Sequence, residues 1–276
     1  MGDTIKKAGV VGWPIEQSKS PIIHGYWLEQ LGISGIYEKI AIEPATFEKD
    51  IRSLSSNGYG GCNVTIPYKE AALALADVVS DRAQAIGASN TLVFRDGKIY
   101  ADNTDGVGFI GNLKQLALDW DAKLGPALVL GAGGAARAIV YSLLQEGTPS
   151  VMIANRTQGK AQKLADFFGD QVTTISMDQV SGVLKNIQTL VNTTSLGMVG
   201  QPELVLDITG LPKTALVTDI VYNPLETGLL KQAKSQGLMT VDGIGMLLHQ
   251  AVTGFEAWFG KRPTVDDVLR EKVLSA

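Results

Sequence analysis

Cysteine and histidine are scarce in this chain. Of its 276 residues only one is a cysteine, Cys62, and two are histidines, His24 and His249. A single cysteine excludes an internal disulfide, and two histidines far apart in the chain make a poor basis for a metal site. The sequence is therefore typical of a protein from a reducing compartment that works without a metal ion.

Long apolar runs and a surplus of positive charge are also absent. No stretch approaches the roughly 20 apolar residues that a spanning helix needs, and Gly12 and Pro14 interrupt the first apolar run before any cleavage-like sequence. The 24 basic residues are outnumbered by 28 acidic ones, which gives a formal charge of −4. This balance disfavours binding to nucleic acid or to an anionic membrane. We expect a cytoplasmic protein, monomer or homodimer, whose partners are small molecules.

The sequence does contain short β-rich runs that alternate with helical patterns. Strands are predicted at 9–12, 37–42, 61–66, 90–94, 99–103, 127–131, 150–154, 188–192 and 216–221. The apolar spacing over 245–258 predicts a late helix. This rhythm indicates an α/β fold of two domains. We place the first domain at residues 1–105 and the second at 106–243, with the helices of 244–276 returning to the first.

A glycine-rich turn follows the strand predicted at 127–131. The sequence GAGGAARA places Gly131, Gly133 and Ala136 at the spacing GxGxxG/A, directly before an apolar helix. Glycine permits a tight turn and a close approach of backbone to a pyrophosphate, and the helix N-terminus supplies free N–H groups. The motif predicts a Rossmann-type dinucleotide-binding domain. Its expected cofactor contacts are the turn residues Gly131, Ala132, Gly133, Gly134 and Ala135.

The end of the next predicted strand carries no acidic residue. An NAD site usually has a carboxylate there for the ribose hydroxyls, whereas this chain has Asn155, Arg156 and Thr157. An arginine can pair with a ribose 2′-phosphate through two charge-assisted hydrogen bonds. Lys160 either adds a second positive charge or is an ordinary solvated lysine. The pattern favours NADP over NAD.

Three polar segments stand out in the first domain: SKSP at 18–21, NVTIPYK at 63–69 and NTDGVGF at 103–109. Each alone has an ordinary structural explanation, such as helix capping by Ser18 or Ser20. Joined by the glycine turn and the NRT tripeptide after it, they resemble the shikimate dehydrogenases, and the resemblance spans nearly the whole chain. Gathered polar groups of this kind suit a polyhydroxylated ligand.

The resemblance carries expectations about fold and activity. It implies an N-terminal three-layer α/β domain that binds shikimate and a second domain that binds NADP. The implied reaction interconverts 3-dehydroshikimate and shikimate, a step of aromatic amino-acid biosynthesis. Lys69 and Asp105 match the catalytic residues of the family. Substrate contacts are implied for Ser18, Ser20, Asn63, Thr65, Asn90, Tyr222 and Gln250, and contacts at the nicotinamide end of the cofactor for Gly243 and Met246.

The chemistry of hydride transfer gives a reason for pairing a lysine with a carboxylate. When hydride reaches a carbonyl carbon, negative charge grows on the oxygen, where an ammonium group stabilises it and can donate a proton. Lys69 can do both, with Asp105 orienting it. Whether Lys69 shuttles the proton or acts mainly as a fixed positive charge stays open at this level. We expect the two side chains to meet.

Three other functions fit parts of the pattern. A quinate/shikimate dehydrogenase of the same family would use NAD or both cofactors, but Ser20 and Arg156 favour shikimate and NADP. A non-catalytic NADP-sensing protein would have lost the pair formed by Lys69 and Asp105. An amino-acid or folate-type dehydrogenase would not need the polar segments of the first domain.

Overall fold

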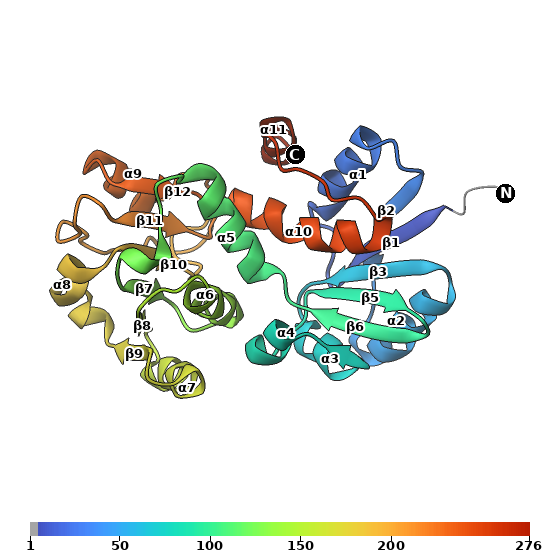
Figure 1. Cartoon of the computed structure of the whole chain (residues 1–276), viewed down its shortest axis with the longest axis horizontal. Helices are drawn as coiled ribbons and strands as arrows, with labels where there is room; N and C mark the ends of the chain where they lie inside the picture. The colour runs from blue at the N-terminus through green and yellow to red at the C-terminus, as the bar shows by residue number, and fades with distance from the viewer. Residues whose placement is uncertain (1–4) are drawn as a thin grey trace. The chain divides into compact units, whose positions relative to one another are not determined.

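The structure, a computed structural model, describes residues 5–276 (Figure 1). The chain separates into two compact units. The first comprises the chain up to Asp105 together with Leu248–Ala276, and the second comprises Gly106–Leu247. Each unit is built on a six-stranded sheet. The α/β fold class expected from the alternating sequence pattern is confirmed.

The sheet of the first unit has the order β2-β1-β3-β5-β6-β4. Strands β1, β2 and β3 are parallel, whereas β5 runs antiparallel to both β3 and β6. The hairpin between β5 and β6 turns at Asp96 and Gly97, whose φ angles of 54° and 70° suit the tight turn that this pair of residues predicts. The strands are β1 (Lys6–Gly12), β2 (Gly35–Ala41), β3 (Tyr59–Val64), β4 (Val78–Val79), β5 (Thr91–Arg95) and β6 (Lys98–Asp102).

Helices pack against this sheet over an apolar core. The side chains of Val11, Ile51, Cys62 and Leu92 are fully buried in the core. The helices are α1 (Ser20–Gln30), α2 (Phe47–Ser56), α3 (Lys69–Ala74), α4 (Asp81–Ile86) and α11 (Asp267–Leu274), with a short 3₁₀ turn at Pro44–Thr46. Both α1 and α3 begin within polar segments singled out in the sequence, at Ser20 and at Lys69, so the fold places those segments at helix starts.

The C-terminal segment is an integral part of the first unit. The indole Nε1 of Trp258, on α10 (Ile244–Phe259), donates to the Leu92 carbonyl at 3.0 Å. The indole passes so close to Gly61 that a Cβ there would lie 2.2 Å from Nε1. Trp27 on α1 in turn donates to the Thr264 carbonyl at 2.8 Å. Residues from both ends of the chain therefore close one core.

The sheet of the second unit is parallel throughout, in the order β12-β11-β10-β7-β8-β9. Its strands are β7 (Ala127–Leu130), β8 (Val151–Ala154), β9 (Val172–Ile175), β10 (Thr189–Asn192), β11 (Leu216–Asp219) and β12 (Met239–Val241). The helices of this part of the chain are α5 (Asp105–Leu116), α6 (Gly134–Gln145), α7 (Gln158–Phe168), α8 (Val180–Val183) and α9 (Gly228–Ser235), with 3₁₀ turns at Ala122–Leu124, Met177–Gln179 and Leu184–Asn186. The chain reverses its order along the sheet between β7 and β10, which is where doubly wound sheets bind nucleotides.

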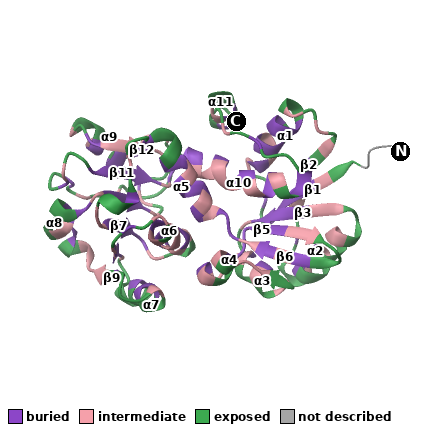
Figure 2. Ribbon diagram, viewed as in Figure 1, coloured by how far each residue is buried: buried purple, intermediate pink, exposed green. Residues whose placement is uncertain are grey.

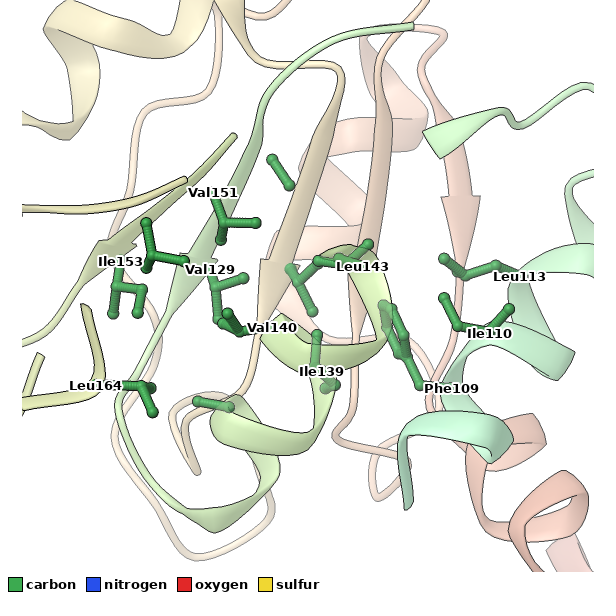
Figure 3. Close-up of a cluster of buried hydrophobic side chains, with 14 of the residues drawn as sticks. Phe109, Ile110, Leu113, Val129, Ile139, Val140, Leu143, Val151, Ile153 and Leu164 are labelled. Atoms are coloured by element: carbon green, nitrogen blue, oxygen red, sulfur yellow. The ribbon is translucent and has the colours of Figure 1, made fainter. Parts of the chain in front are cut away.

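The core of the second unit brings helices α5 and α6 onto β7 and β8. Ile139 and Leu143 of α6 lie beside Val129 of β7, and Phe109 and Leu113 of α5 complete the cluster (Figure 3). Figure 2 shows the central strands β7, β10 and β11 largely buried and the outer sides of the helices exposed. Within residues 5–276, no helix has both the length and the apolar character needed to cross a bilayer.

Candidate active site

Lys69 and Asp105 form an ion pair at the heart of the first unit. Lys69 is the first residue of α3, and its backbone carbonyl accepts a bond from the Ser89 N–H at 2.8 Å. Asp105 is the first residue of α5, and the Asn103 side chain accepts its backbone N–H at 3.1 Å. The Lys69 Nζ lies 2.6 Å from Asp105 Oδ2, and the two side chains keep 32% and 16% of their surface exposed. The ammonium is thus fixed yet open to a ligand.

Asn90 binds the other oxygen of the Asp105 carboxylate. Its amide oxygen accepts from the Thr91 hydroxyl at 2.9 Å, and from the backbone N–H and hydroxyl of Thr104 at 2.9 and 3.1 Å. Those donors leave Nδ2 of Asn90 to donate to Asp105 Oδ1 at 2.8 Å and towards Gln250 Oε1 at 3.4 Å. The orientation of the amide is therefore set by its neighbours.

Asn63 extends this network towards α1. Its Oδ1 accepts from the Tyr37 hydroxyl at 2.6 Å, and its Nδ2 lies 3.2 Å from the Asn90 carbonyl and 3.3 Å from the Thr91 hydroxyl. One buried series of hydrogen bonds therefore runs from Tyr37 to the carboxylate of Asp105.

Ser18 and Thr65 flank this network. The Ser18 hydroxyl oxygen accepts the backbone N–H of Ser20 at 3.3 Å, just where α1 begins. The backbone N–H of Thr65 donates to the Val11 carbonyl at 2.9 Å, and a Cβ on Gly12 would lie 2.6 Å from the Thr65 methyl. Both residues thus stand at the carboxyl-terminal side of β1 and β3, beside the polar network.

His24 supports the network without taking part in proton transfer. The imidazole is fully buried and stacks on the Tyr37 ring with the centroids 3.8 Å apart. Burial lowers its pKa to about 3, so the ring is neutral at physiological pH. The structure therefore assigns His24 a packing role.

Asp102 anchors the loop that carries Asp105. Its carboxylate accepts from the Ser80 hydroxyl and from Nε of Arg82, both at 2.6 Å, and from the Asn103 backbone at 2.8 Å. Burial alone would raise the pKa of the Asp102 carboxyl, but the hydrogen bonds from Arg82 and Ser80 hold it below its ordinary value. The ionised carboxylate thus fixes the start of the loop.

Several members of this site carry no mark in the local sequence. Tyr37, Arg82, Thr91 and Asp102 were not singled out, because each has a partner 13 or more residues away in the sequence, and no local pattern marks such pairs. Thr104 lay inside the NTDGVGF segment, and its place before Asp105 was a usable signal.

The glycine-rich turn of the second unit has the form that the motif predicts. Gly131 follows β7 with φ of 111°, and a Cβ there would lie 2.5 Å from the Thr193 hydroxyl. Gly133 caps α6, and a Cβ on Gly133 or Gly134 would meet nothing within 4 Å. Ala136 is fully buried against the core. The turn, with Ala132 and Ala135, therefore presents bare backbone and an open helix N-terminus, which suits a pyrophosphate.

The NRT tripeptide follows β8, next along the sheet from β7. Asn155 Nδ2 donates to the Thr157 carbonyl at 2.8 Å, and Thr157 caps α7. Arg156 and Lys160 are exposed, and the Lys160 N–H donates to the Thr157 carbonyl at 3.1 Å. Two cationic side chains thus stand at the carboxyl end of β8, as an additional phosphate on the adenosine ribose would require.

The remaining sites of the second unit lie beyond β11 and β12. Tyr222 follows β11 and is partly buried, and burial raises its pKa. Gly243 follows β12 and packs so tightly that a Cβ would lie 2.4 Å from the Ile220 carbonyl oxygen. Met246, on α10, packs against the core of the unit. The structure therefore gathers one set of sequence-predicted residues in each unit. In the first unit they are Ser18, Ser20, Asn63, Thr65, Lys69, Asn90, Asp105 and Gln250.

Comparison with known proteins covers almost the entire chain. Three family models match: the shikimate dehydrogenase substrate binding domain at residues 10–92, shikimate/quinate 5-dehydrogenase at 114–220, and the shikimate 5′-dehydrogenase C-terminal domain at 243–271. The shikimate dehydrogenase (NADP(+)) of Roseobacter denitrificans is 54% identical over 271 residues, which is 98% of each chain. That of Rhodospirillum rubrum is 53% identical, over 97% of this chain and 96% of the relative.

Solved structures agree with these matches. Shikimate 5-dehydrogenase from Thermus thermophilus, in complex with NADP(H) and shikimate, is 36% identical with a TM-score of 0.85, and the match covers 99% of both chains. Quinate dehydrogenase from Corynebacterium glutamicum, in complex with NAD, is 32% identical with a TM-score of 0.90, again over 99% of both. With three family models and relatives above 50% identity along its length, the chain belongs to the shikimate dehydrogenase family.

Proposed function

We propose that this chain is an NADP-dependent oxidoreductase that interconverts 3-dehydroshikimate and shikimate. The observation that carries the proposal is the contact of 2.6 Å between Lys69 and Asp105, which fixes an accessible ammonium group among polar side chains. The relatives named shikimate dehydrogenase (NADP(+)) support the same reaction. The first unit would bind the substrate and the second unit the cofactor.

The residues around Lys69 suit a reduction at a ring carbonyl. The Lys69 ammonium lies against the carbonyl oxygen, stabilises the negative charge that grows there and donates the proton that completes the new hydroxyl. Asp105 holds the ammonium in place and accepts a hydrogen bond from a neighbouring hydroxyl of the ring. Asn90 fixes Asp105, and with Asn63 and Thr65 it offers polar contacts to the ring hydroxyls. Ser18 and Ser20 donate to the substrate carboxylate, and Gln250 and Tyr222 complete the contacts.

The second unit has the features that a dinucleotide phosphate requires. NADPH supplies the hydride when it is bound. The pyrophosphate binds at the start of α6, where the open backbone of Gly133 and Gly134 leaves room for it. Arg156 pairs with the 2′-phosphate, and Lys160 adds a second positive charge. Gly243 and Met246 line the nicotinamide end.

A comparison of substrates and cofactors tests the proposal directly. The purified protein is given 3-dehydroshikimate with NADPH, and separately shikimate or quinate with NADP⁺ or NAD⁺, while the nicotinamide absorbance is followed. We expect turnover with shikimate and NADP⁺ to exceed that with quinate and NAD⁺ by a wide margin. The reverse preference would make the protein a quinate dehydrogenase, a possibility that the fold of the Corynebacterium glutamicum enzyme supports. Binding of NADPH without any turnover would make it a cofactor sensor.

The location and assembly of the protein belong to the same proposal. We infer a cytoplasmic enzyme that acts on small molecules as a monomer or a homodimer. Light scattering coupled to gel filtration, with and without shikimate, distinguishes the two assemblies.

A further inference from the structure

Asp219 is a buried carboxylate that the proposed reaction does not use. It is the last residue of β11 and is 1% exposed. Its Oδ1 accepts from Nδ2 of Asn192 and from the backbone N–H of Val221, both at 3.0 Å. Its Oδ2 accepts from the Thr227 hydroxyl at 2.8 Å. Burial raises the pKa of the Asp219 carboxyl, as expected for an acid whose partners in residues 5–276 are neutral donors.

A carboxylate matches this set of donors better than an amide does. With asparagine in its place, an N–H₂ group would face the Thr227 hydroxyl, whose oxygen already accepts the Leu230 backbone N–H at 3.4 Å. The hydroxyl hydrogen would then lose its acceptor, and a buried donor without an acceptor costs free energy. Burying a carboxylate away from any cation is itself unfavourable unless its hydrogen bonds are complete. The position of Asp219 is therefore strongly constrained by what surrounds it.

The three partners of Asp219 come from two connections of the sheet, the one after β10 and the one after β11. Asn192 ends β10, and its own Oδ1 accepts from the backbone N–H and the hydroxyl of Thr194, at 3.0 and 2.7 Å. Val221 begins the loop that carries Tyr222. Thr227 caps α9. One carboxylate thus ties the loop after β10 to both ends of the loop after β11.

These loops border the glycines proposed to line the cofactor. The Thr193 hydroxyl donates to the Leu130 carbonyl at 2.6 Å, directly before Gly131. Gly243 packs against the carbonyl oxygens of Ile220 and Val221, at 2.4 and 2.7 Å from where a Cβ would be. The loops held by Asp219 therefore set the positions of backbone at both glycines.

The sheet order indicates which half of the cofactor these loops meet. The glycine turn follows β7 and Arg156 follows β8, so the adenosine half lies on the β8 side of the turn. A dinucleotide extends across the point where strand order reverses, so its other half passes over β10 and β11. Asp219 and Asn192 are the last residues of those two strands.

We infer that Asp219 is a positioning residue that builds the nicotinamide end of the cofactor site by clamping the loops after β10 and β11. The inference rests on the proposed NADP-dependent function. Asp219 acts through Tyr222, Gly243 and the 193–196 loop, and its own side chain need not touch the cofactor.

The test compares binding of the whole cofactor with binding of its adenosine half. In Asp219→Asn, the dissociation constant for NADPH should rise about tenfold, as expected when one or two buried hydrogen bonds are lost. The dissociation constant for 2′,5′-ADP, which carries the 2′-phosphate but no nicotinamide, should stay within about twofold, since Arg156 and the glycine turn remain. Asp207→Asn is the matched control, because Asp207 is an exposed acid of the same unit that accepts one backbone bond from Thr209.

Each outcome decides the matter. Equal weakening of NADPH and 2′,5′-ADP, or no weakening of either, would overturn the inference. If Asp219→Asn does not fold, the same two dissociation constants are measured for Thr227→Val, which removes one donor to the carboxylate, and for Thr227→Ser, which keeps that donor. The Val variant should weaken NADPH selectively and the Ser variant should not, and equal behaviour of the two overturns the inference. An unmodified protein that fails to bind NADPH would instead refute the proposed function.

Discussion

The Asp105 carboxylate receives the Lys69 ammonium on one oxygen at 2.6 Å, while its other oxygen is held by the Asn90 amide. An aspartate held on both sides has little freedom to rotate, so it fixes the direction of the ammonium group. Preorganised charge of this kind lowers the barrier to a step in which an alkoxide forms, because no rearrangement is needed as the charge develops.

Replacing Lys69 with alanine should abolish most turnover while leaving substrate affinity nearly unchanged. Loss of the ammonium removes both the proton donor and the positive charge, which together contribute about 10³-fold or more to the rate. Steady-state kinetics with 3-dehydroshikimate measure kcat and KM separately. Lys114→Ala is the control, since Lys114 forms an ordinary exposed pair with Glu146. A Lys69→Ala protein that kept most of its kcat would exclude Lys69 from the mechanism.

Thr91 provides a test of the buried network. Its hydroxyl lies 3.3 Å from Nδ2 of Asn63 and donates to Oδ1 of Asn90 at 2.9 Å, so Thr91→Val breaks both links. We expect the free energy of unfolding to fall by about 1–3 kcal/mol and kcat to fall with it, because a buried acceptor loses its donor and the Asn90 amide loosens. Thr91→Ser keeps the hydroxyl and should keep most of the kcat. Urea unfolding and kinetics on both variants give the answer, and equal activity in the two would contradict the role of the hydroxyl.

Alanine at the two glycines of the cofactor turn should affect different properties: cofactor binding at Gly133 and thermal stability at Gly131. At Gly133 a methyl group meets open space, so Gly133→Ala should leave Tm unchanged but raise the KM for NADPH, since the methyl group would occupy the path of the pyrophosphate. At Gly131 the φ of 111° and the contact with Thr193 forbid a side chain, so Gly131→Ala should lower Tm. Thermal unfolding and cofactor titration separate the effects. A fall in Tm for Gly133→Ala, or none for Gly131→Ala, would contradict this account of the turn.

Arg156 should set the preference between the two cofactors. Arg156→Asp places a carboxylate where the 2′-phosphate is expected, so kcat/KM for NADPH should fall by about 100-fold or more, while that for NADH should change little or rise. The ratio of the two values is the measurement. Lys163→Asp, a charge reversal on α7, the helix that follows Arg156, controls for the change in net charge. Equal losses with both cofactors would remove Arg156 from the recognition of the phosphate.

His24 should make the folded protein sensitive to acid. Its pKa is lowered from 6.5 to about 3 by burial, so protonation favours the unfolded chain. The stability from the neutral ring is complete above pH 6.5 and is lost as the pH falls below that value, by about 2 kcal/mol at pH 5. In His24→Phe, which keeps an aromatic ring against Tyr37, this part of the loss should vanish. His249, whose pKa is lowered by burial to about 4, contributes the same acid sensitivity to the unmodified protein and to His24→Phe. Urea unfolding at pH 7 and pH 5 compares the two, and identical acid sensitivity would refute the assignment.

Much of the fold follows from the local pattern of the sequence, and the exceptions have a common cause. The central strands were predicted because they are continuous apolar runs between turn residues. Strands β4, β9 and β12 were not, because each lies at the edge of a sheet, spans two to four residues and keeps part of its surface exposed. Such strands exist through pairing with a neighbour, and pairing is invisible in a local window.

The candidate site divides in the same manner. Lys69, Asp105 and the glycine turn belong to compact motifs with a chemical meaning, so they could be proposed from sequence alone. The residues that orient them could not. Tyr37 is hydrogen-bonded to Asn63, 26 residues away in the sequence, and Asp219 to Asn192, 27 residues away. A tyrosine or an aspartate inside a strand region has no local mark that distinguishes it from an ordinary surface residue.

The docking of Trp258 over Gly61 has a consequence for the order in which the protein can fold as it is synthesised. The first unit needs residues beyond Leu248 to close its core, so it cannot be completed while the ribosome is still making the second unit. Gly106–Leu247 is a continuous stretch and can collapse as soon as it emerges. The half that is translated first is therefore finished last, and until then its unfilled apolar surface is the part of the nascent chain most exposed to chaperones and proteases.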